Sequence, residues 1–292
     1  MIPEPQRTYV LELLAALGPA AKDFVIAGAQ AIKFVVKNAR GTKDVDFILN
    51  VIALRVEPLQ LEAVLNRLGY TAIAGARNFQ FEKTIPNSKE TMRIEFMAPE
   101  EFKRAADFRV DVQKGIHARA CTGGTIALAE SDEYPLEGRL PNGEPYAARV
   151  LVTRPHALVM LKLLALFDRY HNIRGPEEAR HDREEAQTHA ADIVEIVKAR
   201  PDLAEFRRQF EAQFAADVEL GKRVSQILND CFREPIAPGY LLYEEYLAAT
   251  LPAGATTQVE IRDESALAHR TLQKILPERP LQEMNTIVNL IP

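Results

Sequence analysis

The stretch FVIAGAQAIKFVVKNARGTKDVDFIL, residues 24–49, constrains the fold more than any other part of the chain. An apolar run ends at Gly28, a short segment with helical spacing follows, and a second apolar run opens with two aspartates. Successive side chains of a strand point to opposite faces. Asp44 and Asp46 are therefore predicted to share one face of a strand, while the apolar residues that alternate with them form the other face.

The two aspartates make a metal site the natural expectation for this strand. Two carboxylates held side by side on a stiff strand repel each other unless a cation lies between them. Magnesium, or manganese in its place, prefers carboxylate oxygens as ligands. Asp44 and Asp46 are thus candidate metal ligands, and the opposite face of the same strand is expected to belong to the core.

Apolar periodicity and turn residues predict a mixture of helices and strands on both sides of this stretch. Residues 115–149 are rich in Gly, Pro and short apolar pieces, which predicts irregular strands and turns near a sheet edge. The other expected elements are a helix over 6–18, a strand over 24–27, a helix over 30–36, a loop over 37–42, a helix over 58–68 and strands over 78–83 and 91–97.

A second constellation is VLVTRPHALVMLKLLALFDRY, residues 150–170. Thr153 and Pro155 are typical of a helix start, and the segment that follows is almost wholly apolar, which predicts a buried helix. Lys162 and Arg169 lie seven residues apart, two helical turns, so they share one face. Two cations on a buried face are suited to a triphosphate. The alternative is that Lys162 reaches out to water and Arg169 pairs with a nearby acid.

From residue 177 onward the pattern is helical to near the end of the chain, with apolar faces typical of a bundle core. We therefore predict an α+β protein: a mixed sheet flanked by helices in residues 1–152, followed by a C-terminal helical domain in residues 153–292. The expected helices of the second part cover 177–198, 202–215, 217–232, 240–249 and 264–275.

Charge and cysteine content narrow the functional classes. A formal net charge of −5 argues against a broad basic surface for non-specific nucleic-acid binding. Cys121 and Cys231 lie far apart and have no Cys-x-x-Cys partner, so they are expected to be reduced thiols of a cytoplasmic protein. The opening residues, MIPEPQRTYV, lack the pattern of a signal peptide, and no apolar run is long enough to predict a membrane span.

The order of these motifs resembles the nucleotidyltransferase superfamily that includes DNA polymerase beta. The resemblance extends over about residues 20–200 and is greatest to the abortive-infection nucleotidyltransferase toxins of the AbiEii type. It implies a nucleotidyltransferase-fold sheet with the site on it. The residues that carry it are Gly28 and Ala29 in the turn, Arg40 and Thr42 before the Asp-x-Asp pair, Asp44, Asp46, Lys162 and Arg169.

The resemblance also implies roles for particular residues. A third carboxylate on a neighbouring strand completes the metal site in this superfamily, and Glu95 in RIEFM matches it, with Asp111 in RVDV as the alternative. Asp44, Asp46 and Glu95 are then both catalytic and metal-binding. The implied nucleotide-binding residues are Gly28, Ala29, Arg40, Thr42, Lys162 and Arg169.

The activity implied is metal-dependent transfer of a nucleoside monophosphate from a nucleoside triphosphate to an acceptor. RNA, with tRNA ends among the candidates, a protein hydroxyl or a small molecule all suit this chemistry. A toxin of a toxin–antitoxin or phage-defence system, with an antitoxin partner, fits the nearest resemblance. The competing hypothesis is a catalytically inactive binding or regulatory protein with the same fold, because Ala29 replaces the usual Ser or Gly of the turn.

Overall fold

The computed structural model describes residues 2–37, 39–42, 44–86, 88–103, 108–172, 175–250 and 258–277. The chain forms two compact units. Met1–Ala165 and Glu195–Ala199 make up the first, and Leu166–Val194 and Arg200–Pro292 the second. The division falls inside the long helix that begins at Pro155, and a domain boundary after residue 152 stays a prediction.

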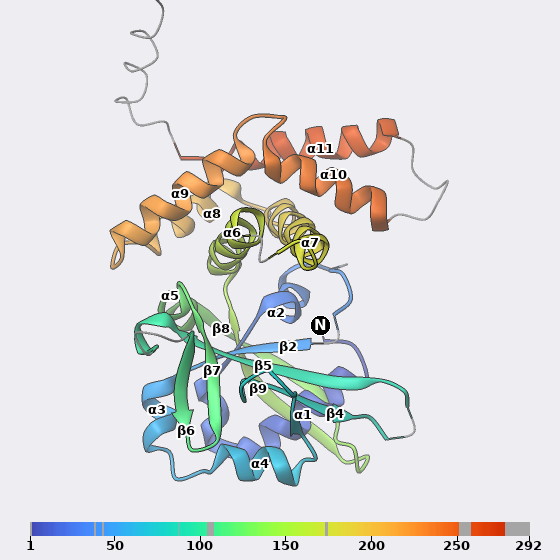
Figure 1. Cartoon of the computed structure of the whole chain (residues 1–292), viewed down its shortest axis with the longest axis vertical. Helices are drawn as coiled ribbons and strands as arrows, with labels where there is room; N and C mark the ends of the chain where they lie inside the picture. The colour runs from blue at the N-terminus through green and yellow to red at the C-terminus, as the bar shows by residue number, and fades with distance from the viewer. Residues whose placement is uncertain are drawn as a thin grey trace, which may run out of the picture. The chain divides into compact units, whose positions relative to one another are not determined.

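The first unit is a mixed sheet with helices on both faces, the predicted α+β arrangement (Figure 1). The strand order is β3-β4-β5-β2-β1-β9-β8, and the β6–β7 hairpin joins β5 through β7. The strands are β1 (Phe24–Ala27), β2 (Asp44–Leu49), β3 (Thr71–Ala72), β4 (Gln80–Thr84), β5 (Thr91–Pro99), β6 (Arg109–Gln113), β7 (Ile116–Cys121), β8 (Ser131–Arg139) and β9 (Pro145–Thr153). The helices are α1 (Gln6–Leu17), η1 (Gly18–Asp23), α2 (Gly28–Val35), α3 (Val51–Val56), α4 (Leu61–Arg67), η2 (Glu100–Phe102) and α5 (Gly124–Ala129).

One face of this sheet forms an aromatic core. The rings of Phe24, Phe47, Phe81 and Phe96 contact one another with centroids between 5.6 and 6.4 Å apart. Helices α1, α3 and α4 lie on one side of the sheet, and α2 and α5 on the other (Figure 1). Each tilted or edge-on aromatic pair adds about 0.5–1.5 kcal/mol beyond the area it buries. The aromatic face therefore holds β1, β2, β4 and β5 in register.

The predicted helix over 6–18, the strand over 24–27 and the hairpin of 78–83 with 91–97 are confirmed as α1, β1 and β4–β5. For residues 115–149 the expected strands near a sheet edge are confirmed, since β8 is an edge strand, but the expectation that they are irregular was wrong. They form β7, α5, β8 and much of β9, and β9 pairs in parallel with β1 inside the sheet. Most of the β8–β9 ribbon is exposed or half-buried, so its sequence lacks the apolar alternation that marks a half-buried strand.

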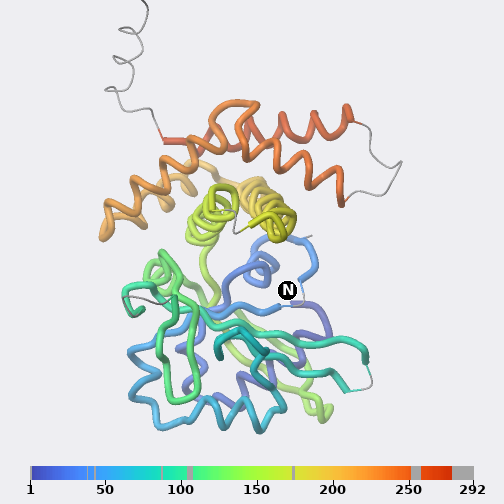
Figure 2. Tube along the Cα trace, in the orientation of Figure 1, coloured from blue at the N-terminus to red at the C-terminus, as the bar shows by residue number. Residues whose placement is uncertain are grey.

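The second unit is helical, as predicted (Figure 2). Asp202 and Asp217 cap two of its helices, because their carboxylates accept hydrogen bonds from first-turn N–H groups. No described helix is long and apolar enough to cross a membrane. The helices are α6 (Pro155–His171), which begins in the first unit, α7 (Ala179–Lys198), α8 (Leu203–Ala212), α9 (Val218–Phe232), α10 (Pro238–Thr250) and α11 (Gln258–Leu272).

The turn from β1 into α2 requires glycine. Gly28 has a φ of +60°, which side chains with a Cβ rarely adopt. A Cβ built on Gly28 would lie only 1.8 Å from Oδ2 of Asp46. The backbone of the turn therefore packs directly against the second aspartate of β2. The two apolar runs of residues 24–49 meet at this point.

Replacing Gly28 with alanine is expected to destabilise the first unit more than replacing Gly69. Both residues have positive φ, at +60° and +82°, but a Cβ on Gly69 meets nothing within 4 Å. Positive-φ strain costs about 1–2 kcal/mol at either site, and only Gly28→Ala also displaces a carboxylate. Urea unfolding of both variants measures the difference in free energy of unfolding. Equal losses would contradict the tight approach of Gly28 to Asp46.

Candidate active site

A row of polar side chains crosses three neighbouring strands on the face opposite the aromatic core. Asp46 of β2 is in register with Glu95 of the parallel strand β5, and Glu95 is in register with Gln80 of β4. Adjacent strands lie about 4.8 Å apart, so registered side chains on one face are neighbours. Asp44 lies one step along β2 on the same face, opposite Arg93, and is more exposed. The sheet thus brings Asp44, Asp46 and Glu95 together.

Asp46 titrates far from its usual range. Burial, and after it the negative charge of Glu95, raise the pKa of the Asp46 carboxyl to about 7. The positive charges of Lys162 and Arg119 oppose this shift, but they do not cancel it. Near neutral pH both the protonated and the ionised form of Asp46 are therefore populated in the folded chain. A strongly perturbed carboxyl among charged partners is typical of a functional site.

Lys162 is the buried cation of the site. Its residue is 7% exposed on α6, within the part of that helix that belongs to the first unit. Its charge favours the ionised form of Asp46, which places the ammonium near the carboxylates. A buried ammonium is stable only when an anion faces it. This electrostatic effect places Lys162 near Asp46, and its contact with a triphosphate stays a prediction.

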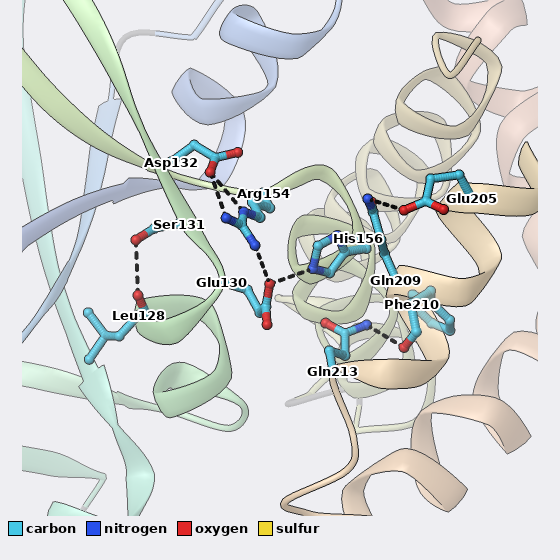
Figure 3. A network of polar contacts seen from close by, with 10 residues as sticks. All are labelled: Leu128, Glu130, Ser131, Asp132, Arg154, His156, Glu205, Gln209, Phe210 and Gln213. Atoms are coloured by element: carbon cyan, nitrogen blue, oxygen red, sulfur yellow. Dashed lines mark hydrogen bonds and ion pairs between the residues drawn. The ribbon is translucent and has the colours of Figure 1, made fainter. Parts of the chain in front are cut away.

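A polar network fixes the start of α6 and so the position of Lys162 (Figure 3). Glu130 Oε2 accepts from Arg154 Nη1 at 3.0 Å and lies 3.0 Å from His156 Nε2. Arg154 also donates through Nε to Asp132 Oδ1 at 2.9 Å. These contacts join the end of α5, the start of β8, the end of β9 and the first turn of α6. The helix therefore leaves the sheet in a defined direction.

The loop before β2 is braced from α2. Gln30 is fully buried, and its Nε2 donates to the Thr42 carbonyl at 3.3 Å. The Asp44 N–H donates to Thr42 Oγ1 at 3.3 Å, so Thr42 fixes the entry of the Asp-x-Asp strand. Arg40 lies close enough to Lys33 for its charge to add to burial in lowering the pKa of that lysine. Arg40 on the loop and Lys33 on α2 thus place two positive charges near each other.

Two further predicted residues have other contacts. Arg169 belongs to the second unit, where its Nη1 lies 3.0 Å from Oδ1 of Asp182, a residue that is 1% exposed. This ion pair agrees with the alternative in which Arg169 pairs with a nearby acid. A contact between Arg169 and phosphate stays a prediction. Asp111 lies on β6, with Oδ1 3.1 Å from His117 Nδ1. Glu95, by contrast, is the registered neighbour of Asp46.

The carboxylates do not form a ready metal site as they lie. Among the described residues, no group of three or more His, Cys, Asp or Glu side chains is arranged to hold a metal ion. Glu95 accounts for part of this, because its Oε1 accepts from Arg119 and its Oε2 from Gln80. The donors nevertheless fit a hard divalent cation. They are carboxylate oxygens, and burial and the charge of Glu95 both disfavour the ionised form of Asp46, which a bound cation would stabilise.

Sequence reasoning missed Arg119 and Gln80, which hold Glu95. Arg119 lies in IHARAC, which was not recognised as a strand, although His117, Arg119 and Cys121 alternate with Ala118 and Ala120. With a strand assigned there, the alternation would have placed Arg119 on a polar face. Gln80 carried no signal, because its partnership with Glu95 depends on the register between β4 and β5.

Comparison with known proteins places the chain in a family. Residues 12–288 match the family described as nucleotidyl transferase AbiEii toxin, type IV TA system. The chain matches no curated protein.

Two solved structures from Helicobacter pylori align with the chain. JHP933 is 12% identical, with a TM-score of 0.33 over 99% of this chain and 100% of that one. A candidate nucleotidyltransferase is 14% identical, with a TM-score of 0.32 over 95% and 100%. At these scores the assignment rests on the family match alone. By that match the chain belongs to the AbiEii nucleotidyl transferase toxin family of type IV toxin–antitoxin systems, and it is a nucleotidyltransferase.

Proposed function

We propose that the chain transfers a nucleoside monophosphate from a nucleoside triphosphate to an acceptor hydroxyl, with a divalent cation held by Asp44, Asp46 and Glu95. The observation that carries the proposal is the registered pair of Asp46 and Glu95, with the pKa of Asp46 raised to about 7. Two adjacent acids that resist joint ionisation are stabilised by a bound cation. Magnesium or manganese is the proposed cofactor.

In the proposed reaction, the acceptor oxygen attacks the α-phosphorus of the triphosphate. A new O–P bond forms, the bond from the α-phosphorus to the bridging oxygen breaks, and pyrophosphate leaves. The proton of the acceptor hydroxyl passes to solvent. A bound divalent cation supplies charge stabilisation for the attacking and leaving oxygens.

The chain's own groups position the triphosphate in this proposal. Gly28 has no side chain, so the backbone of the turn can approach a phosphate group closely. The N–H groups at the start of α2 suit phosphate oxygens even though Ala29 offers no hydroxyl. Lys162 supplies a buried positive charge near the carboxylates. Thr42 fixes the entry of the strand that carries both aspartates. Arg40 and Arg169 are the remaining proposed phosphate contacts.

The acceptor and the biological setting complete the proposal. RNA, including tRNA ends, a protein hydroxyl and a small molecule all offer the hydroxyl that the reaction needs. Family membership supports a toxin that is countered by an antitoxin, and the proposed place of action is the cytoplasm. Expression of the chain alone is then expected to slow growth.

Replacing Asp46 with asparagine is expected to lower transfer by at least about a hundredfold, because a neutral amide cannot take the place of a carboxylate ligand. The assay incubates the protein and magnesium with each α-labelled triphosphate and, separately, total RNA, cell protein or small-molecule extract. The acceptor is the fraction that gains label, and Asp46→Asn is also expected to restore growth. Undiminished labelling by the variant would remove Asp46 from the reaction and contradict the proposal.

Replacing Lys162 with methionine is expected to weaken triphosphate binding about tenfold or more while α6 stays folded. Methionine keeps the apolar stem of the side chain and removes only the charge. Calorimetry with each nucleoside triphosphate measures the affinity, and circular dichroism checks the helix content. Lys222→Met is a matched control, because that exposed lysine pairs with Glu219 on α9. Unchanged affinity in Lys162→Met would leave this lysine with a structural role only.

The pH dependence of stability reports on Asp46 directly. The folded chain keeps its proton up to about pH 7, while an unfolded aspartate loses it near pH 4. Between these values Asp46 binds more protons in the folded state than in the unfolded state, so its contribution to the stability of wild type falls as pH rises. Asp46→Asn lacks this penalty, so its stability relative to wild type should grow from pH 4 to pH 7 and then level off. Metal-free thermal unfolding gives the curve, and a constant difference would contradict the shifted pKa.

A further inference from the structure

Arg119 approaches the carboxylates from the strand next to Glu95. β7 runs parallel to β5 with Arg119 in register with Met97, so Arg119 lies on the face that carries Glu95. Its Nε lies 2.5 Å from Oε1 of Glu95, and its Nη2 lies 3.3 Å from the sulfur of Met97. The arginine side chain remains 45% exposed, whereas that of Glu95 is 15% exposed. The guanidinium thus covers Glu95 from the solvent side.

Both oxygens of Glu95 are engaged in this arrangement. Arg119 Nε donates to Oε1, and Gln80 Nε2 donates to Oε2 at 2.7 Å. Asp46, the registered neighbour of Glu95, feels the arginine as well, because the charge of Arg119 favours its ionised form. One guanidinium therefore partly neutralises two adjacent carboxylates. A divalent cation would supply the same charge to the same pair.

We propose that Arg119 is a positioning residue that holds Glu95 in the metal-free enzyme and competes with the divalent cation for that carboxylate. The inference rests on the proposed function, since it takes Glu95 as a metal ligand. It explains why the described carboxylates lie close together without forming a ready metal site. In this account the cation binds fully only when the contact between Arg119 and Glu95 loosens.

The competition predicts that removing the guanidinium strengthens metal binding. A divalent cation must break the charge-assisted hydrogen bond between Arg119 and Glu95 before it binds that carboxylate, which lowers its affinity on the order of tenfold. Arg119→Met should therefore bind Mn²⁺ about tenfold more tightly than wild type, with no nucleotide present. Arg119→Lys, which keeps the charge, should stay within about threefold of wild type. Titration calorimetry of the full-length, metal-free chain with Mn²⁺ gives both values.

A double-mutant cycle decides whether Arg119 acts through Glu95 or as a distant charge. In a Glu95→Gln background the ion pair is already broken and only the charge of Arg119 near Asp46 remains, so adding Arg119→Met should strengthen Mn²⁺ binding by less than about threefold. Arg149→Met is the matched control, because Arg149 makes a similar ion pair with Glu133 at 2.6 Å on the β8–β9 ribbon. It removes the same charge and should leave Mn²⁺ affinity unchanged.

The outcomes separate this inference from the proposed function. Binding that is about tenfold tighter in Arg119→Met, with a gain that shrinks to threefold or less in the Glu95→Gln background, supports the inference, and an equal gain in both backgrounds overturns it. Unchanged or weaker binding in Arg119→Met, with wild type binding Mn²⁺ and Asp46→Asn not binding it, overturns the inference and leaves the proposed function intact. An absence of Mn²⁺ binding in every variant contradicts both. If Arg119→Met does not fold, Arg119→Gln replaces it as the variant that removes the charge, and Arg119→Lys stays the variant that keeps it.

Discussion

The repulsion between Asp46 and Glu95 is the interaction on which the rest of the site depends. Parallel pairing of β2 with β5 places the two carboxylates next to each other, and burial deprives them of the water that would screen them. Two such groups are stable together only with protons or cations around them. Burial, and after it the charge of Glu95, raise the pKa of Asp46, and the neighbouring cations Lys162 and Arg119 oppose that shift.

The two faces of the sheet differ: one packs into the aromatic core, and the other carries the charged side chains of the site. The aromatic cluster on one face fixes the register of β1, β2, β4 and β5, so the opposite face cannot slide to relieve the repulsion. Gly28, which follows β1 directly, borders the site because its backbone packs against Asp46. The network around Glu130 sets the start of the helix that carries Lys162. Core packing thus sets the geometry of charged groups on the other face.

Sequence alone predicted the parts of this arrangement that depend on local periodicity. Asp44 and Asp46 share a face because a strand alternates, and Lys162 is buried because its helix is apolar on almost every side. Register between strands is not encoded in such periodicity, so Glu95 was reached only through a family resemblance, and Gln80 was missed. Arg119 was missed because its segment was interpreted as irregular. Arg169 shows the limit of helical spacing, which cannot tell a phosphate contact from a buried ion pair with Asp182.

The most direct test is a titration of the Asp46 carboxyl monitored by ¹³C NMR, once with magnesium and once without it. Without metal, the account predicts a midpoint near the value of about 7 that burial and Glu95 impose. Magnesium should lower that midpoint, because a bound cation stabilises the ionised carboxylate. A midpoint near 4 that magnesium leaves unchanged would contradict the central claim that adjacent acids on this sheet create a cation site.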